Sequence, residues 1–265
     1  MFLSSLLIFI QDMKFSEFLR RVMFYVTVPE CVGCKEKLSV SDIALCHSCS
    51  KKHELLKTKN CSRCSNILSN CTCSNTYLEK HRVKRLIKAY RYLITDEISP
   101  SNNLIFSLKK ETRRDVLHLL TGELELAIIN SGIDVNESCI FTNVPRRKKA
   151  IAQYGIDHAG RLSKSLAKRF GAEYKSTLRS MTKREQKGMK FDDRKKNAAF
   201  SQKGKYDLKG KTVFLIDDIV TTGSSMAASA DILYRMGAKA VIGVAVAIAY
   251  RDSYIPFPKQ DYVYW

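Results

Sequence analysis

The chain lacks any apolar run long enough to cross a lipid bilayer. Its two longest mostly apolar stretches, Met1–Ile10 and Ala240–Tyr250, fall short of the roughly 20 residues that a membrane helix needs. The first stretch also lacks the basic flank and the small-residue cleavage site of a signal peptide. We therefore expect a cytoplasmic protein without stable membrane insertion. Translation could begin at Met1 or at Met13, because a sensible helix follows either residue.

Acidic residues are also scarce. The 26 Asp and Glu residues face 45 Lys and Arg residues, which gives a formal net charge of +19 and a sequence pI of about 9.6. This excess favours a polyanionic partner, either nucleic acid or a phosphorylated ligand. With 45% apolar and 27% charged residues, the chain is globular rather than disordered. Its 265 residues suffice for one α/β domain of ordinary size and a small appendage.

Cysteine, in contrast, is concentrated in one segment. Eight of the nine cysteines form four close pairs: Cys31 and Cys34, Cys46 and Cys49, Cys61 and Cys64, and Cys71 and Cys73. A C-x-x-C pair on a tight turn lets two thiolates reach one ion, and two pairs complete a tetrahedral Zn²⁺ site. A disulfide framework is disfavoured because the chain has no credible export signal. We predict one or two structural zinc ions.

The cysteine pairs could share these ions in sequential or in interleaved order. In the sequential arrangement, the first four cysteines hold one ion and the last four hold another. His47 and His53 lie close enough in the chain to replace a thiolate, but we expect both to be solvated. The remaining cysteine, Cys139, lies in a strand-like run and is expected to be buried and inert.

The most informative stretch is Val213–Met226. The apolar run Val213–Ile216 predicts a buried strand that delivers Asp217 and Asp218 to its carboxyl end. A turn of small residues then leads into a helix-like run. The turn consists of Thr221, Thr222, Gly223, Ser224 and Ser225. Loop amides, hydroxyls and the helix dipole suit a phosphate. The two acids suit sugar hydroxyls, or a cation that itself carries phosphates.

A basic loop and a polar segment precede this motif. The short strand Cys139–Val144 runs into Pro145, Arg146 and Arg147, and a basic loop at the carboxyl end of a strand suits a pyrophosphate. Residues 175–210 are polar and basic, which predicts a mobile lid, with a surface hairpin as the alternative. The α/β alternation from about 104 to 250 predicts a parallel sheet with helices on both faces.

The middle of the chain is less decisive. Residues 77–100 could form a strand or a helix, and their basic and aromatic residues could form a nucleic-acid face or a solvated side: Lys84, Arg85, Lys88, Tyr90, Arg91 and Tyr92. Residues 104–132 show helical spacing, with core leucines at positions 104, 108, 117, 120 and 124. We expect His118 to be packed in this helical stretch.

Together these features resemble a known family. Val213–Met226 resembles the phosphoribosyl-diphosphate (PRPP) signature of type I phosphoribosyltransferases, which is an apolar strand, two adjacent acids and then Thr-Thr-Gly. From about residue 14 onward, the chain resembles the ComF family of competence and DNA-uptake proteins. The resemblance includes the cysteine pairs, the segment SLKKETRRD, the Val-Pro-plus-basic loop, and the lid residues Gln186, Gly188, Arg194, Asn197 and Phe200. One departure is Gly155-Ile156-Asp157-His158-Ala159, where the family usually carries Gly-Phe-Asn-Gln-Ala.

The resemblance implies a type I phosphoribosyltransferase-like α/β fold with a small N-terminal zinc-ribbon domain. Asp217 and Asp218 would be the catalytic residues and would hold the ribose hydroxyls with help from Mg²⁺. The loop 221–225 would bind the 5′-phosphate of PRPP. The pyrophosphate would face Val144, Pro145, Arg146 and Arg147.

The same resemblance divides the chain into a helical lead-in at 1–30, a zinc-ribbon module at 31–76 and a phosphoribosyltransferase-like domain at 77–265. It implies a protein that binds PRPP and single-stranded DNA in DNA uptake or natural transformation. The DNA-uptake machinery and a second copy of the chain are further candidate partners. The alternatives are a phosphoribosyltransferase that acts on a nucleobase or small amine, and a non-catalytic PRPP sensor.

Overall fold

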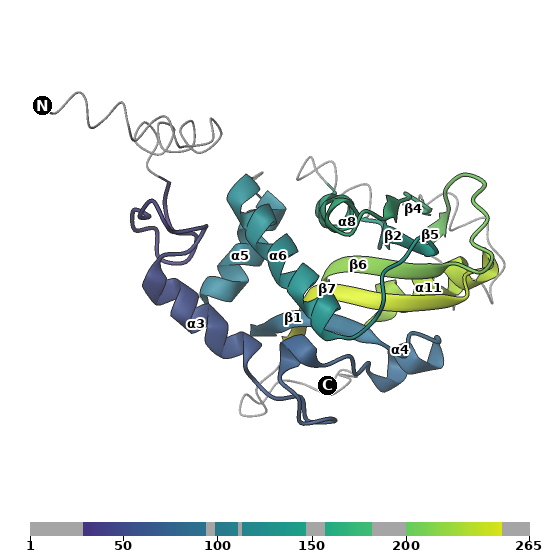
Figure 1. The fold of residues 1–265 in the computed structure, drawn as a ribbon, viewed down its shortest axis with the longest axis horizontal. Helices are drawn as coiled ribbons and strands as arrows, with labels where there is room; N and C mark the ends of the chain where they lie inside the picture. Colours follow the sequence, from purple (N-terminus) through teal and green to yellow (C-terminus); the bar gives the residue numbers. More distant parts are fainter. Residues whose placement is uncertain (1–28, 94–98, 111–112, 147–156, 182–199, 251–265) are drawn as a thin grey trace, which may run out of the picture.

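The computed structural model describes residues 29–93, 99–110, 113–146, 157–181 and 200–250. Its centre is a five-stranded parallel sheet in the order β1-β7-β6-β2-β3 (Figure 1). The strands are β1 (Leu86–Leu93), β2 (Cys139–Asn143), β3 (Glu173–Tyr174), β6 (Thr212–Val220) and β7 (Ala240–Tyr250). The parallel sheet predicted from the sequence is confirmed, and β7 has the bounds of the apolar run at 240–250.

Helices cover both faces of this sheet. They are α5 (Pro100–Lys110), α6 (Arg114–Asn130) and α8 (His158–Arg169) on one face and α11 (Ser224–Arg235) on the other. Strand β6 divides its side chains between the two cores. Phe214 and Ile216 join the core under α5, α6 and α8, whereas Val213 and Leu215 join the core under α11. Since side chains of a strand alternate between faces, β6 is buried on both sides at the centre of the sheet.

The cysteine-rich segment consists of short elements that lie against the sheet domain. They are α3 (His47–Lys57), the 3₁₀ turn η1 (Leu68–Asn70) and α4 (Thr76–Lys80). Figure 1 shows α3 beside α5 and α6, and α4 near α11. The predicted domain boundary after residue 76 stays a prediction.

A buried histidine attaches α3 to the sheet domain. His53 Nδ1 lies 2.7 Å from Ser101 Oγ of α5, and its Nε2 lies 2.8 Å from Glu123 Oε1 of α6. Burial alone would raise the pKa of Glu123, but the hydrogen bond and charge of His53, with the charge of Lys57, lower it. The expectation of a solvated His53 is therefore wrong, because this ring is only 2% exposed. His47 is exposed, as predicted.

Residues 86–93 form a buried strand instead of an exposed nucleic-acid face. Strand β1 pairs with β7, and its Lys88 and Tyr90 are buried. Arg91 donates a hydrogen bond to the carbonyl oxygen of Asn60 at 2.7 Å. The predicted face is wrong for these side chains, which are held inside the protein or against its own backbone. Lys84 and Arg85, which precede β1, are exposed and stay available for such a role.

The helical stretch 104–132 is two helices, α5 and α6. Its leucines at 104, 108, 120 and 124 are buried in the core, and Leu117 packs against the core while partly exposed. The prediction that His118 is packed is wrong: His118 is exposed, and its Nδ1 lies 3.2 Å from a guanidinium nitrogen of Arg169. Cys139 is buried, as predicted.

The segment predicted as a lid contains regular structure at both ends. Strands β4 (Leu178–Ser180) and β5 (Phe200–Gln202) pair antiparallel, in agreement with the alternative of a surface hairpin. The lid residues Gln186, Gly188, Arg194 and Asn197 lie outside the described residues, as do the lead-in at 1–28 and the segment 251–265. None of the helices in the described part of the chain is long and apolar enough to cross a bilayer.

Candidate functional site

The carboxyl ends of β2 and β6 lie side by side and carry the predicted site residues. Asn143 of β2 pairs with Ile216 of β6 in the parallel register. This register brings the loop at 144–146 to the same edge of the sheet as Asp217 and Asp218. In open α/β sheets, this is the edge at which ligands bind.

The two acids have different surroundings. Burial of its carboxyl group and then the neighbouring charge of Asp218 raise the pKa of Asp217 well above its ordinary value. Asp218 forms an ion pair with Lys109 of α5, with 3.1 Å between Oδ2 and Nζ. Its Oδ1 accepts a hydrogen bond from the amide of Ile219 at 2.7 Å. Two adjacent acids of this kind suit ribose hydroxyls or a divalent cation.

A single glycine allows the chain to turn from β6 into α11. Gly223 has φ 85° and ψ 0°, in the left-handed region where other residues are strained. On either side of it, the hydroxyls of Thr222 and Ser224 lie 3.1 Å apart, and Thr222 Oγ1 accepts a hydrogen bond from the Ser224 amide at 3.3 Å. Thr221 and Ser225 are exposed. Helix α11 thus begins at a tight turn of hydroxyl-bearing residues, which is an arrangement suited to a phosphate.

A cavity of about 300 Å³ lies at this edge of the sheet. Acidic, basic and aromatic side chains line it together: Lys109, Val144, Pro145, Arg146, Asp157, His158, Ala159, Phe200, Asp217, Asp218, Ile219 and Ser225. The loop residues 221–224 connect this lining to α11 along the chain. Arg147 lies outside the described residues. The structure therefore brings the predicted acids, the start of the basic loop and the end of the loop 221–225 to one cavity.

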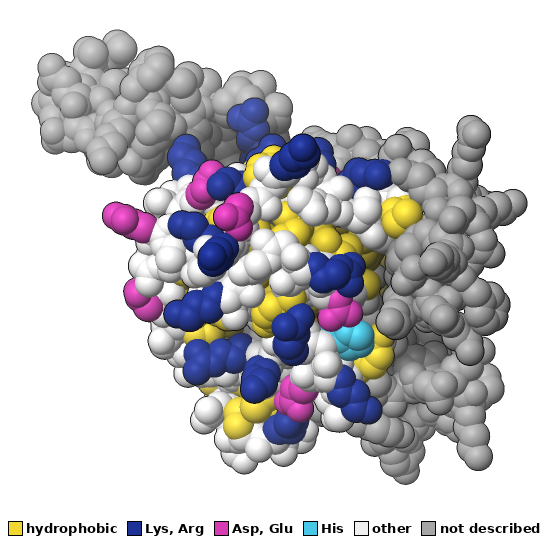
Figure 2. Space-filling view, turned by 90° about the vertical axis from the view of Figure 1, so that its right-hand side faces the viewer, with side chains coloured by type: hydrophobic (Ala, Val, Ile, Leu, Met, Phe, Trp, Pro, Cys, Tyr) yellow, Lys and Arg dark blue, Asp and Glu magenta, His cyan; other side chains and the backbone are white. Residues whose placement is uncertain are grey.

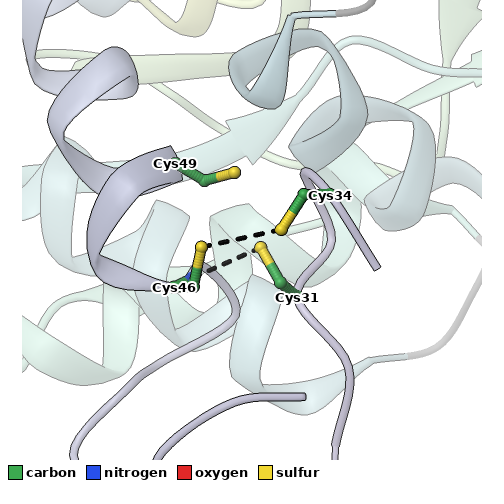
Figure 3. Close-up of side chains that lie close together, drawn as sticks. All are labelled: Cys31, Cys34, Cys46 and Cys49. Atoms are coloured by element: carbon green, nitrogen blue, oxygen red, sulfur yellow. Dashed lines mark hydrogen bonds between the residues drawn. The ribbon is translucent and has the colours of Figure 1, made fainter. Parts of the chain in front are cut away.

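The paired cysteines form two separate groups in the sequential arrangement. The first group is Cys31, Cys34, Cys46 and Cys49, and the second is Cys61, Cys64, Cys71 and Cys73. In each group the four sulfur atoms lie within 4.8 Å of one another. Figure 3 shows the first group, in which the Sγ atoms of Cys34 and Cys46 are 3.6 Å apart. Since zinc–thiolate bonds of about 2.3 Å place tetrahedral ligands roughly 3.8 Å apart, both groups fit a Zn²⁺ ion.

The thiols within each group differ in their pKa values. Although burial opposes the shift, hydrogen bonds from the backbone of Cys46 and Cys34 lower the pKa of Cys31 to about 7. The pKa of Cys61 is lowered to about 7 in the same way. In contrast, burial and the neighbouring thiols raise the pKa of Cys73 to about 12. A cation bound among these thiols would favour their ionised, metal-binding form.

A buried lysine adjoins the second group. Lys88 of β1 is 2% exposed, and its Nζ lies 3.2 Å from Cys71 Sγ. The same ammonium donates a hydrogen bond to the carbonyl oxygen of Cys73 at 2.6 Å. Four thiolates around one Zn²⁺ would carry net negative charge, which the ammonium group would partly offset.

Comparison with known proteins agrees with this geometry. Residues 150–264 match the family model of the phosphoribosyl transferase domain. The DNA utilization protein YhgH of Escherichia coli K12 is 24% identical over 225 residues, which cover 82% of this chain and 96% of that protein. The chain therefore contains a region similar to the phosphoribosyl transferase domain, and over most of its length it is similar to proteins named DNA utilization proteins. YhgH of Shigella flexneri matches this chain with the same identity and coverage.

Solved structures were compared as well. The adenine phosphoribosyltransferase of Saccharomyces cerevisiae is 16% identical to this chain, with a TM-score of 0.35 over 58% of this chain and 75% of that chain. The phosphoribosyltransferase-like fold rests on the parallel sheet and on the match to the family model.

Two residues of the cavity have no role assigned by any motif. Lys109 lies within the segment SLKKETRRD, but only the fold brings it to Asp218. His158 stands where ComF proteins usually carry Gln, and it is 1% exposed. Burial and then the charge of Arg146 lower the pKa of His158, so its ring is neutral near pH 7. The preceding residue, Asp157, caps α8, since its side chain accepts a hydrogen bond from the amide of Gly160 at 3.0 Å.

Proposed function

We propose that the protein binds PRPP with Mg²⁺ at the carboxyl end of β6 and handles single-stranded DNA during DNA uptake. One observation carries the proposal: an acidic pair, a basic loop and a hydroxyl-rich helix start meet at one cavity of about 300 Å³. PRPP offers ribose hydroxyls, a pyrophosphate and a 5′-phosphate, and each of these groups has a chemical counterpart there.

Each part of the site takes one part of the ligand. Asp217 and Asp218 hold the ribose hydroxyls and would also hold Mg²⁺, which supplies positive charge to the pyrophosphate. The loop 221–225 holds the 5′-phosphate, and the loop 144–147 faces the pyrophosphate. In the free protein, Lys109 pairs with Asp218, so this ion pair has to separate or rearrange when the ligand binds.

The DNA part of the proposal rests on charge and on the relatives. The chain carries a net charge of +19, and the proteins that match most of its length are named DNA utilization proteins. A basic surface binds single-stranded DNA through its phosphates. A cytoplasmic location, two bound zinc ions and contact with the uptake machinery or with a second copy belong to the same proposal.

A titration with PRPP tests the ligand site. The wild type and Asp218→Asn are each titrated with and without Mg²⁺ by calorimetry. We expect the substitution to weaken binding at least tenfold and to abolish most of the effect of Mg²⁺. Asp134→Asn is the matched control, because Asp134 is exposed and precedes β2, at the opposite edge of the sheet. Equal affinity for PRPP under all conditions would contradict the proposed site.

A second candidate function is pentosyl transfer to a nucleobase or small amine. The observation that favours it is His158, which lines the cavity and carries a neutral ring near pH 7. In this reaction, an acceptor nitrogen bonds to ribose C1 as the bond from C1 to the pyrophosphate oxygen breaks. The proton of the acceptor nitrogen then needs a base, and a neutral imidazole is suited to take it. Phe200 adds an aromatic wall for a flat acceptor.

Pyrophosphate release separates these functions. PRPP is incubated with a panel of nucleobases and small amines, and pyrophosphate is measured over time. Release that depends on one acceptor and falls in Asp218→Asn would establish the transferase. Tight PRPP binding without release for any acceptor would favour the non-catalytic alternative, a PRPP sensor.

A further inference from the structure

One side chain connects the second cysteine group to the loop at residues 221–225, which we call the phosphate loop. Asn75 follows Cys73 by two residues and is 2% exposed. Its Nδ2 donates a hydrogen bond to the carbonyl oxygen of Thr222 at 3.3 Å, across 147 positions of the chain. Its Oδ1 accepts a hydrogen bond from the amide of Leu78 at 2.8 Å, which caps α4. The two contacts fix the orientation of the amide group, because its oxygen faces α4 and its nitrogen faces the loop.

Leu78, in the same segment, packs closely against Gly223 of the loop. Leu78 is fully buried, and a Cβ atom added to Gly223 would lie 2.8 Å from Leu78 Cγ. The turn after α4 is also held to α11: His81 Nδ1 lies 2.7 Å from Asp231 Oδ2. The phosphate loop and the start of α11 therefore pack directly on the segment that leaves the cysteine group.

Side chains beside the second cysteine group hold the backbone just before Asn75. Arg63, which lies between Cys61 and Cys64, donates hydrogen bonds to the carbonyl oxygen of Ser74 and to Glu79 Oε1 of α4. Lys88 of β1 donates to the carbonyl oxygen of Cys73 at 2.6 Å. A short chain of contacts thus runs from the second group through residues 73–75 to the carbonyl of Thr222.

The carbonyl of Thr222 matters because it belongs to a rigid peptide plane. In a trans peptide, the C=O and the following N–H point in opposite directions. Holding this carbonyl toward Asn75 therefore turns the N–H of Gly223 away from Asn75. A peptide next to glycine flips readily, because glycine tolerates both signs of φ. Without the contact to Asn75, the loop could adopt a second orientation of this peptide and lose the alignment of its amides.

We propose that Asn75 is a positioning residue for the phosphate loop, and that metal in the second cysteine group keeps Asn75 in place. This inference rests on the proposed function, because it assigns the loop 221–225 to the 5′-phosphate. It predicts that the two phosphate-binding parts of the site respond differently to a substitution of Asn75. Loss of the contact from Asn75 weakens ligands that carry a 5′-phosphate and leaves pyrophosphate binding at the loop 144–147 unchanged.

Two substitutions at this position test the proposal. Asn75→Asp and Asn75→Ser both keep an oxygen that can cap α4, but both lose the donor to Thr222. We expect PRPP and ribose 5-phosphate to bind about tenfold more weakly to both variants, as for the loss of one hydrogen bond from a buried carbonyl. Pyrophosphate should bind as in the wild type. Asn70→Asp is the matched control, because Asn70 is exposed in the same segment and should change none of the three affinities.

The pattern of losses decides the outcome. Weaker binding of PRPP to Asn75→Asp but not to Asn75→Ser would indicate a charge effect and would overturn the positioning role. Equal weakening of ribose 5-phosphate and pyrophosphate would overturn it too, because a general loss of structure moves both. Thermal unfolding of each variant checks that the capping oxygen preserves the fold.

Hydrogen exchange without any ligand separates this inference from the proposed function. In Asn75→Ser, the amides of residues 221–225 should exchange faster than in the wild type, while those of β6 stay protected. Cys64→Ser, which removes one thiolate of the second group, should accelerate the same amides. If the wild type bound none of the phosphates, the proposed function would fail, yet the exchange would still test the contact. Unchanged exchange in both variants would overturn the inference.

Discussion

At the scale of single residues, Asp217 and His158 face the same cavity, and burial moves their pKa values in opposite directions. The pKa of Asp217 is raised by burial and by the charge of Asp218, whereas that of His158 is lowered by burial and by the charge of Arg146. Both shifts favour the neutral form. A divalent cation beside Asp217 would oppose this shift, because it stabilises the ionised carboxylate.

The lowered pKa of His158 predicts a pH dependence of stability. The ordinary value of the histidine pKa is 6.5, and the folded protein keeps this ring neutral to a lower pH. Between the folded value and 6.5, the unfolded chain binds more protons, so the free energy of unfolding falls as the pH is lowered. We expect the free energy of unfolding of His158→Gln to fall less between pH 7 and pH 5 than that of the wild type. Above pH 7.5, the two proteins should show nearly the same pH dependence.

Urea unfolding at several pH values measures this effect. His118→Gln is the control, because it removes an exposed histidine of α6 that does not line the cavity. Parallel pH profiles for the wild type and His158→Gln would show that the ring does not titrate differently in the folded protein.

At the scale of elements, the site could be predicted where its signals are contiguous in sequence. An apolar run, two acids and a turn of small residues identify β6, its loop and α11, because strand, ligand edge and helix start follow one another in the chain. Lys109 could not be assigned in this way. It lies on α5, and only helix packing brings it to Asp218.

Strand β1 shows a different limit of sequence patterns. Charged Lys88 and Arg91 interrupt its apolar pattern, so strand, helix and an exposed basic face are equally compatible with the segment. Burial of Lys88 becomes understandable only with its partners, which are a thiol and a carbonyl of the second cysteine group. Likewise, His53 is buried because Ser101 and Glu123 meet it from two separate helices.

Replacement of Lys88 should therefore act on one metal group only. Lys88→Met keeps the apolar stem but removes the ammonium group beside Cys71. We expect the second group to bind Zn²⁺ about 10- to 100-fold more weakly, as for the loss of a hydrogen-bonding partner of a metal ligand. Competition with a chelator, followed by zinc analysis, should remove one ion early and leave the other bound.

The neighbouring Lys84→Met serves as the control, because Lys84 is exposed and precedes the same strand. Release of both zinc ions at equal rates from Lys88→Met would indicate a general loss of stability. Unchanged zinc affinity would mean that the ammonium group contributes nothing to the metal group.

At the scale of the whole molecule, positive charge is spread over the surface. Figure 2 shows Lys and Arg side chains scattered over one face, with fewer Asp and Glu among them. Part of the nucleic-acid face expected from the sequence is buried, but its Lys84 and Arg85, in the turn before β1, are exposed, as are the neighbouring Lys80 at the end of α4 and Arg82. The guanidinium of Arg82 also lies 3.8 Å from the ring centre of Tyr234. This turn is therefore the part of the expected face that could still contact DNA.

The proposed DNA binding has to depend strongly on salt. Each phosphate neutralised on a single strand adds about −0.7 to the slope of log affinity against log salt. For roughly five phosphates, a rise from 50 to 200 mM salt should therefore weaken binding about 100-fold. Fluorescence anisotropy with a labelled, unstructured oligonucleotide measures the slope.

A pair of double variants locates the surface. Lys84→Glu/Arg85→Glu should weaken DNA binding and flatten the salt slope, because these charges belong to the exposed turn before β1. Lys51→Glu/Lys52→Glu on α3 changes the net charge by the same amount at two exposed positions. If non-specific attraction to a net charge of +19 were the whole cause, both double variants would lose affinity equally. A loss confined to the first variant would instead place the DNA on the turn before β1. That turn is continuous with α4, so DNA there would lie close to the phosphate loop that α4 contacts.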